Sequence, residues 1–127
     1  MADPTYERGI EIQRELGLWV EGAASNPVHD DFSKFGTRFA FGEVWSRPGL
    51  DLRTRSCITI AILTALVRPE YLAMHLKAGL RNGLSPDEMR EVIFHTAVYA
   101  GITAGAQAMR VADEVLGASS STKQEQE

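Results

Sequence analysis

Prolines, glycines and helix-capping side chains divide this sequence into about six segments of helical length. Ser85-Pro86-Asp87-Glu88 is the clearest of these signals. A serine N-cap with a glutamate three residues later forms a capping box, and proline fits the first turn because its missing N–H is not needed there. Asn26-Pro27 repeats the arrangement of N-cap and proline. No segment shows the sustained alternation of apolar and polar residues that indicates a strand. The sequence therefore predicts an all-α fold.

The same signals give the bounds of the expected helices. They start after Asp3, Asn26, Asp51, Arg68, Ser85 and either Gly101 or Thr103, and the last helix ends near Leu116. The second helix is expected to end near Trp45 and the fourth at Asn82-Gly83. The third is apolar on most of its sides and is expected to be the central buried helix. We expect one domain over residues 1–117 and a disordered tail over residues 118–127, because the segment SSSTKQEQE has no apolar side chain to bury.

Small residues recur at helical spacing in the last expected helix. Gly101, Ala104, Gly105 and Ala108 fall close to one face. Small side chains on one face let two helices approach closely. The partner helix belongs either to the same chain or to a second subunit, and the spacing alone leaves both interpretations open.

Composition narrows the functional classes. The chain has 127 residues, of which 44% are hydrophobic and 24% charged, as is ordinary for one globular domain. The net charge of −4 argues against a nucleic-acid binder. No apolar run is long enough to span a membrane, and MADPTYERG has no secretory signal pattern. A single cysteine, Cys57, excludes an internal disulfide and is typical of a cytoplasmic protein.

His75 lies in the stretch RPEYLAMH, in the most helix-like part of the chain. It follows Tyr71 by four residues, so both side chains project from one face of the fourth expected helix. Leu72 and Leu76 belong to an apolar stripe beside that face, which places His75 at the edge of the core. An imidazole with a pKa of about 6.5 suits proton transfer at neutral pH. A structural histidine fits the same spacing.

The stretch FGEVWSRPGLDLRTRS, residues 41–56, combines Glu43, Trp45 and three arginines. Arg53 and Arg55 lie near the start of the third expected helix, where backbone N–H groups and the helix dipole favour an anion. Guanidinium groups, including that of Arg47, bind carboxylates through paired hydrogen bonds. The stretch predicts a site for a small anionic ligand, and a solvated basic turn is the alternative. No ligand spacing in the sequence indicates a metal site.

These stretches carry a resemblance to a known family. Residues 41–56, the stretch MHLKAGLRNGLSPDEMREVIFHTAVYAG and the closing ADEVL resemble the carboxymuconolactone decarboxylase family, over nearly the whole domain from about Tyr6 to Leu116. The resemblance implies an alkylhydroperoxidase D-like helical fold, assembled as a homotrimer or homohexamer. It also implies a carboxy-lyase of protocatechuate catabolism, which converts γ-carboxymuconolactone to β-ketoadipate enol-lactone and CO2 without a cofactor.

The wider superfamily includes alkylhydroperoxidase D-like proteins, which use a Cys-x-x-Cys pair followed by a histidine. The histidine corresponds to His75, and the cysteine positions hold Arg68 and Tyr71. The resemblance therefore excludes peroxidase chemistry through that thiol pair. It implies that His75 has a functional role.

The chemistry that the resemblance implies suggests a role for each candidate residue. Loss of CO2 leaves an electron pair that delocalises to the lactone carbonyl oxygen, so the substrate is its own electron sink. His75 is the candidate for delivering the proton or stabilising the oxyanion, and Glu43 for orienting or recharging His75. The expected substrate-binding residues are Arg47, Arg53, Arg55, Trp45 and Tyr71.

Two segments differ from the pattern typical of these decarboxylases. Residues 68–71 bring a proline and a phenol, and residues 99–107 read YAGITAGAQ in place of a proline-containing turn. A family member acting on another lactone or a β-keto acid is therefore an alternative. A non-catalytic helical scaffold is a third interpretation. A polar cluster at the edge of a core speaks against it, because desolvating such a cluster is costly.

Overall fold

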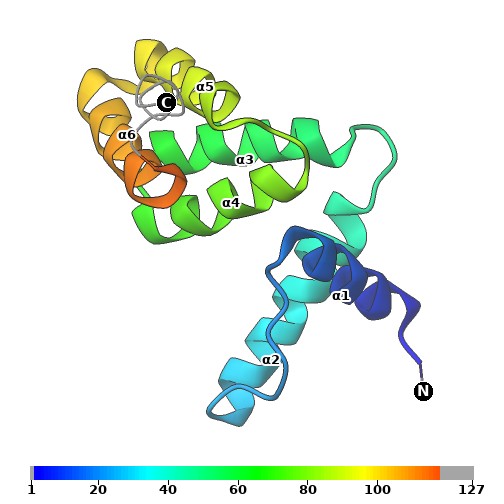
Figure 1. The fold of residues 1–127 in the computed structure, drawn as a ribbon. Coiled ribbons are helices and arrows are strands. Elements are labelled where there is room, and N and C mark those ends of the chain that lie inside the picture. Colours follow the sequence, from blue (N-terminus) through cyan, green and yellow to red (C-terminus); the bar gives the residue numbers. More distant parts are fainter. Residues whose placement is uncertain (1, 118–127) are drawn as a thin grey trace. The chain divides into compact units, whose positions relative to one another are not determined.

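The computed structural model describes residues 2–117, which form helices joined by short loops (Figure 1). The elements are α1 (Pro4–Leu16), α2 (Pro27–Gly36), the π-helix η1 (Thr37–Trp45), α3 (Leu52–Ala65), α4 (Pro69–Arg81), α5 (Pro86–Ala100) and α6 (Ile102–Leu116). No strand occurs among these residues, which confirms the all-α prediction. Helices also begin directly after each of the six predicted start positions. The tail predicted over residues 118–127 lies outside the described residues.

The chain folds as two compact units, one ending at Leu52 and the other beginning at Arg53. The first unit contains α1, α2 and η1. The second contains α3, apart from its first residue, and α4 to α6. The expectation of one domain over residues 1–117 stays a prediction.

A close helix crossing holds the first unit together. A Cβ atom added at Gly9 of α1 would collide with the backbone of Thr37, and one added at Gly42 of η1 would collide with the backbone of Thr5. Both positions require glycine because the two helix backbones touch there. The second expected helix does reach Trp45, but its last nine residues are a π-helix, which the sequence analysis did not predict. π-helical turns occur frequently at functional sites.

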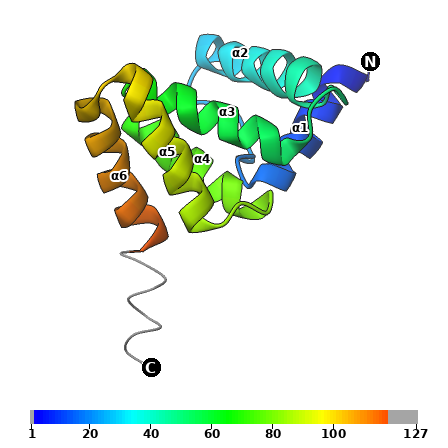
Figure 2. The same ribbon diagram turned by 90° about the horizontal axis from the view of Figure 1, so that it is seen from above.

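The core of the second unit lies among α3, α4, α5 and α6. Figure 2 shows α5 and α6 side by side in opposite directions. Its buried residues are Ile60, Leu72, Leu76, Leu84, Met89, Ile93, Ala108, Val111 and Ala112. The capping box predicted at Ser85 and Glu88 is present. Gly105 of α6 lies against Ala97 of α5, where an added Cβ would come within 2.5 Å of the alanine Cβ. Ala104, Gly105 and Ala108 are thus buried within the chain, whereas Gly101 is exposed.

The prediction that the third helix is the central buried one is wrong for the chain by itself. Only Ser56, Ile60 and Thr64 of α3 are buried. Ile58, Ile62 and Leu66 are 43%, 50% and 55% exposed. The reason is geometric, because residues four apart share one helix face and the second unit covers only one face of α3.

Val67 ends α3 in a strained conformation. Its φ of 58° makes it the one residue other than glycine with a positive φ in the described range. The Arg68 N–H donates to the Leu63 carbonyl at 3.0 Å and the Val67 N–H to the Thr64 carbonyl at 3.2 Å, which is the Schellman pattern. A glycine normally occupies this position, since a branched side chain is crowded in the left-handed region.

Replacing Val67 with glycine should therefore raise the free energy of unfolding by about 1 kcal/mol, because the left-handed conformation no longer carries a steric cost. Urea denaturation followed by circular dichroism measures the change. Ala65→Gly, two residues earlier and still in the helix, is the matched control and should lower the free energy by about 1 kcal/mol. A fall for Val67→Gly as well would contradict the strain at this position.

Candidate functional site

His75 lies in the middle of α4 and is half-buried, with the fully buried Leu76 beside it in the chain. Burial lowers the pKa of the imidazole below its usual value of 6.5, because the cationic form loses its hydration. The position at the edge of the core is as predicted. Burial of His75 therefore favours the neutral imidazole over the imidazolium.

Tyr71 precedes His75 by one helical turn and is 59% exposed. The two side chains share one face of α4, as their spacing predicted. A phenol with this exposure is free of the core and accessible to a ligand. Tyr71 is thus the more exposed of the two side chains on this face of α4.

Arg53 and Arg55 lie in the first turn of α3, also as predicted. Arg53 forms an ion pair with Glu88 of α5. Arg55 is half-buried and its Nε atom is enclosed. The two guanidinium groups therefore have different surroundings, and Arg53 has a carboxylate partner within the chain.

The first unit carries the remaining three predicted residues on η1 and just after it. Glu43 is exposed, and its carboxylate lies 3.8 Å from Arg38, which also bonds Asp3 at 3.1 Å. Trp45 is buried and stacks on Phe41 with 5.9 Å between ring centroids. Arg47 is exposed in the turn that follows.

The seven predicted residues thus divide into Glu43, Trp45 and Arg47 in the first unit and Arg53, Arg55, Tyr71 and His75 in the second. Sequence reasoning missed Arg38, the partner of Glu43, since nothing in its neighbourhood marks it.

Sequence reasoning also missed the bond from the Asn82 amide to the Ser56 hydroxyl, at 2.8 Å. Asn82 was interpreted only as a turn residue. The signal that could have found the pair is a serine on the buried face of an otherwise apolar helix.

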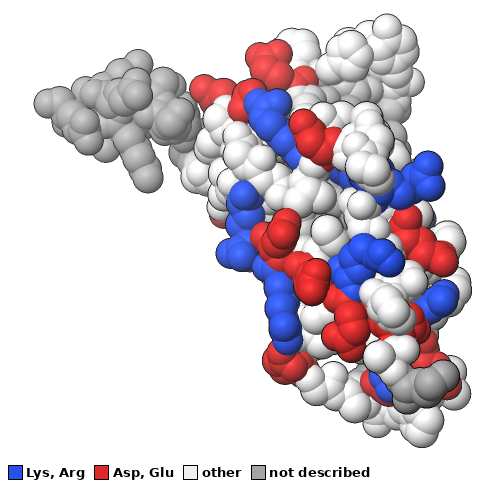
Figure 3. All heavy atoms as spheres, turned by 90° about the vertical axis from the view of Figure 1, so that its right-hand side faces the viewer, with Lys and Arg blue, Asp and Glu red and all other residues white. Residues whose placement is uncertain are grey.

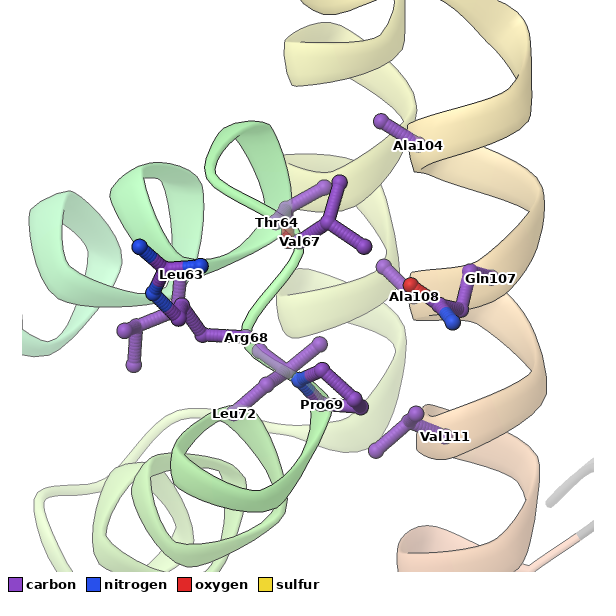
Figure 4. Close-up of a pocket in the computed structure, with 10 residues that line it drawn as sticks. All are labelled: Leu63, Thr64, Val67, Arg68, Pro69, Leu72, Ala104, Gln107, Ala108 and Val111. Atoms are coloured by element: carbon purple, nitrogen blue, oxygen red, sulfur yellow. The ribbon is translucent and has the colours of Figure 1, made fainter.

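A small hollow at the junction of α3, α4 and α6 is not a candidate site. Figure 4 shows Val67, after α3, facing Gln107 and Ala108 of α6 across it. It has no room for a water molecule. The hollow is a packing gap beside the strained Val67.

An apolar groove between α5 and α6 is roomier, with a volume of about 290 Å³. Its lining residues are Ile93, Phe94, Ala97, Val98, Ile102, Gly105, Ala106 and Met109. It has no charged side chain to bind an anion, so it does not suit a carboxylate substrate.

Charged side chains of both signs are distributed over the surface of the chain. Figure 3 shows basic and acidic side chains interspersed on the face that it draws, without a continuous basic area. Within residues 2–117, no cluster of three or more histidine, cysteine or acidic side chains is arranged to hold a metal ion. None of the described helices has both the length and the apolar character to cross a membrane.

Comparison with known proteins identifies the family. The model of the carboxymuconolactone decarboxylase family matches residues 30–114, a range that includes all seven predicted site residues. The chain belongs to the carboxymuconolactone decarboxylase family. The resemblance noted in the sequence is thereby confirmed.

Two curated relatives extend this result. A 4-carboxymuconolactone decarboxylase of Acinetobacter baylyi is 46% identical over 87% of this chain and 85% of its own length. A nitrosuccinic acid decarboxylase of Metarhizium robertsii is 30% identical over 87% of this chain and 80% of its own length. Both relatives are named as decarboxylases, with different substrates.

The lowered pKa of His75 predicts how this side chain titrates and how the stability of the protein depends on pH. Nuclear magnetic resonance of the imidazole protons should give His75 a midpoint below 6.5. The unfolded chain then binds this proton more readily than the folded one. The free energy of unfolding should therefore fall as the pH drops below 6.5, until folded His75 also titrates.

His75→Gln assigns the resonance and should remove this part of the pH dependence. A His75 midpoint above 6.5 would contradict the desolvation that the structure gives this side chain.

Proposed function

We propose that this chain converts γ-carboxymuconolactone to β-ketoadipate enol-lactone and CO2 in the catabolism of protocatechuate. The observation that carries the proposal is the 46% identity to a 4-carboxymuconolactone decarboxylase across 87% of this chain and 85% of that relative. The reaction needs groups that hold a dianion, stabilise a developing oxyanion and return a proton to carbon. It needs no electron sink from the protein, because the lactone supplies its own.

His75 delivers the proton or stabilises the oxyanion in this proposal. Burial lowers the pKa of the free side chain. A bound dianion nearby raises that pKa, because opposite charge favours the imidazolium. The substrate itself would thus promote the protonation of His75 that the last step uses. Glu43 orients or recharges His75 in the same scheme.

The arginines Arg47, Arg53 and Arg55 are the candidates for binding the two substrate carboxylates. Trp45 supplies an apolar wall that desolvates the leaving carboxylate and favours neutral CO2. Tyr71, exposed one turn from His75, contacts the substrate ring. No cofactor takes part in this scheme.

The test of this function is the ultraviolet decay of γ-carboxymuconolactone, generated in situ by its cycloisomerase. The protein should accelerate the decay with stoichiometric release of CO2. His75→Ala should lower kcat by at least about a hundredfold, as expected for loss of a proton-transfer group.

His95→Ala is the matched control, because His95 is exposed on α5, where its ring contacts Tyr99. The control should keep full activity. A near-normal rate for His75→Ala would remove His75 from the mechanism.

A second substrate is the alternative, and the nitrosuccinic acid decarboxylase relative favours it. The family then accommodates more than one activated carboxylic acid, and this chain acts on another lactone or a β-keto acid. The segments at 68–71 and 99–107 are where substrate selection is expected to differ. A folded protein without turnover of γ-carboxymuconolactone would favour this alternative.

The chain also has the surface of a subunit, and we propose a homotrimer or homohexamer in the cytoplasm. Phe94, Val98, Tyr99 and Ile102 are between 66% and 82% exposed on and beside the α5–α6 groove. Monomeric proteins rarely expose so large an apolar patch, and a second copy would cover it. The single cysteine fits a reducing compartment.

Light scattering after size-exclusion chromatography should give the mass of three or six chains. Val98→Asp should reduce the mass, because a charge in an apolar interface loses its hydration. Glu114→Lys, an exposed change of charge on α6, should leave the mass unchanged. An unchanged mass for Val98→Asp, or a monomeric wild type, would contradict this interface.

A further inference from the structure

Two side-chain interactions hold the first two turns of α3 against the end of α4 and the first turn of α5. The Asn82 amide donates to the Ser56 hydroxyl at 2.8 Å, and Arg53 pairs with Glu88. We call these four residues the α3 clasp. All four belong to the second unit.

Ser56 is a polar side chain in a core position. Its exposed fraction is 0%, and a buried hydroxyl is costly unless it forms a hydrogen bond. Asn82 supplies that bond across to the neighbouring helix. The geometry of the turn does not require an asparagine, because Gly83 takes the left-handed conformation with a φ of 92° while Asn82 has a φ of −89°.

The clasp matters because α3 has few apolar anchors. Ile60 is the only large apolar residue of α3 that is fully buried, with Cys57 and Leu63 partly buried against the core. With so few apolar contacts, the rotation of α3 about its own axis depends more strongly on its polar contacts. The Ser56–Asn82 bond fixes that rotation at the end of α3 where the arginines lie.

Arg55 directly precedes Ser56 in the chain and is half-buried, with its Nε atom enclosed. Its direction therefore follows the rotation that Ser56 fixes. Arg53 differs, since its guanidinium is already paired with Glu88. The two arginines thus differ, although the sequence treated them alike. Arg53 holds α3 against α5, and the orientation of Arg55 depends on that of α3.

We propose that Ser56 and Asn82 are positioning residues, which hold the Arg55 guanidinium in the direction that binds a substrate carboxylate, and that Arg53 is a brace. This inference rests on the proposed function and narrows its set of carboxylate-binding arginines to Arg47 and Arg55. A guanidinium that binds the carboxylate equally in the ground state and the transition state contributes to KM and leaves kcat unchanged.

The first test measures steady-state kinetics of γ-carboxymuconolactone turnover in Ser56→Ala. We expect KM to rise about tenfold with kcat nearly unchanged, because a misdirected guanidinium forms weaker charge-assisted hydrogen bonds with the substrate carboxylate. In an Arg55→Ala background, adding Ser56→Ala should raise KM no further, since the group that Ser56 aims is absent.

The matched control is Thr64→Val, which also removes a buried hydroxyl from α3, two turns further along. It should leave KM and kcat unchanged. The thermal unfolding temperature of each variant shows whether a change in KM comes from loss of stability or from misplacement of Arg55. A Ser56→Ala protein with lowered stability and normal KM, or a KM effect that persists without Arg55, would overturn the proposal.

The second test needs no turnover. Isothermal titration with adipate, a dicarboxylate without a lactone, measures anion binding directly. Kd should rise about tenfold in Ser56→Ala and Arg55→Ala, and no further in the double variant. If the wild type turns over no γ-carboxymuconolactone but shows this coupling, the positioning role stands and the substrate assignment fails. Additive effects, or a wild type that binds no adipate, would overturn the positioning role.

Discussion

The close packing of α4 against α5 and α6 is the constraint on which the second unit depends. Gly79 of α4 leaves room for the Met89 sulfur, which a Cβ at that position would meet at 2.7 Å. Gly105 does the same for Ala97. Because the helices approach so closely, Leu76 is completely enclosed, and the neighbouring His75 is drawn into a desolvated border. The lowered pKa of His75 is therefore a consequence of core packing.

Local chemistry made much of this fold predictable. The capping box at Ser85 and the proline starts work within a few residues of the chain, so the sequence was sufficient to place them. The sequence did not predict the π-helix, whose Gly42 packs against the backbone of Thr5 in another helix, a contact that no local pattern records. Apolarity around α3 was misleading for a similar reason. An apolar side chain such as that of Ile62 favours burial, but the sequence does not indicate which surface covers it.

The sequence placed the individual candidate residues in their helices or turns, but it did not predict which side chains pair with one another. Helical spacing gave the shared face of Tyr71 and His75, because that face follows from 3.6 residues per turn. The partner of Arg53 lies 35 residues away along the chain, and the partner of Ser56 lies 26 residues away. Pairings over such distances depend on how helices dock, which no local pattern records. Family membership supplied the chemistry that spacing alone left open.

Glu88 has two roles at once. Its carboxylate accepts from the Ser85 N–H at 2.9 Å, closing the start of α5, and it pairs with Arg53 of α3. The Ser85 N–H first, and then Arg53, hold the pKa of this carboxyl below 4.5, so its contribution to stability is present above that pH and lost as the pH falls through the lowered value. Protonation of this one carboxyl therefore weakens the cap of α5 and the ion pair with α3 together. The two contacts, one within α5 and one between α3 and α5, therefore share one titration.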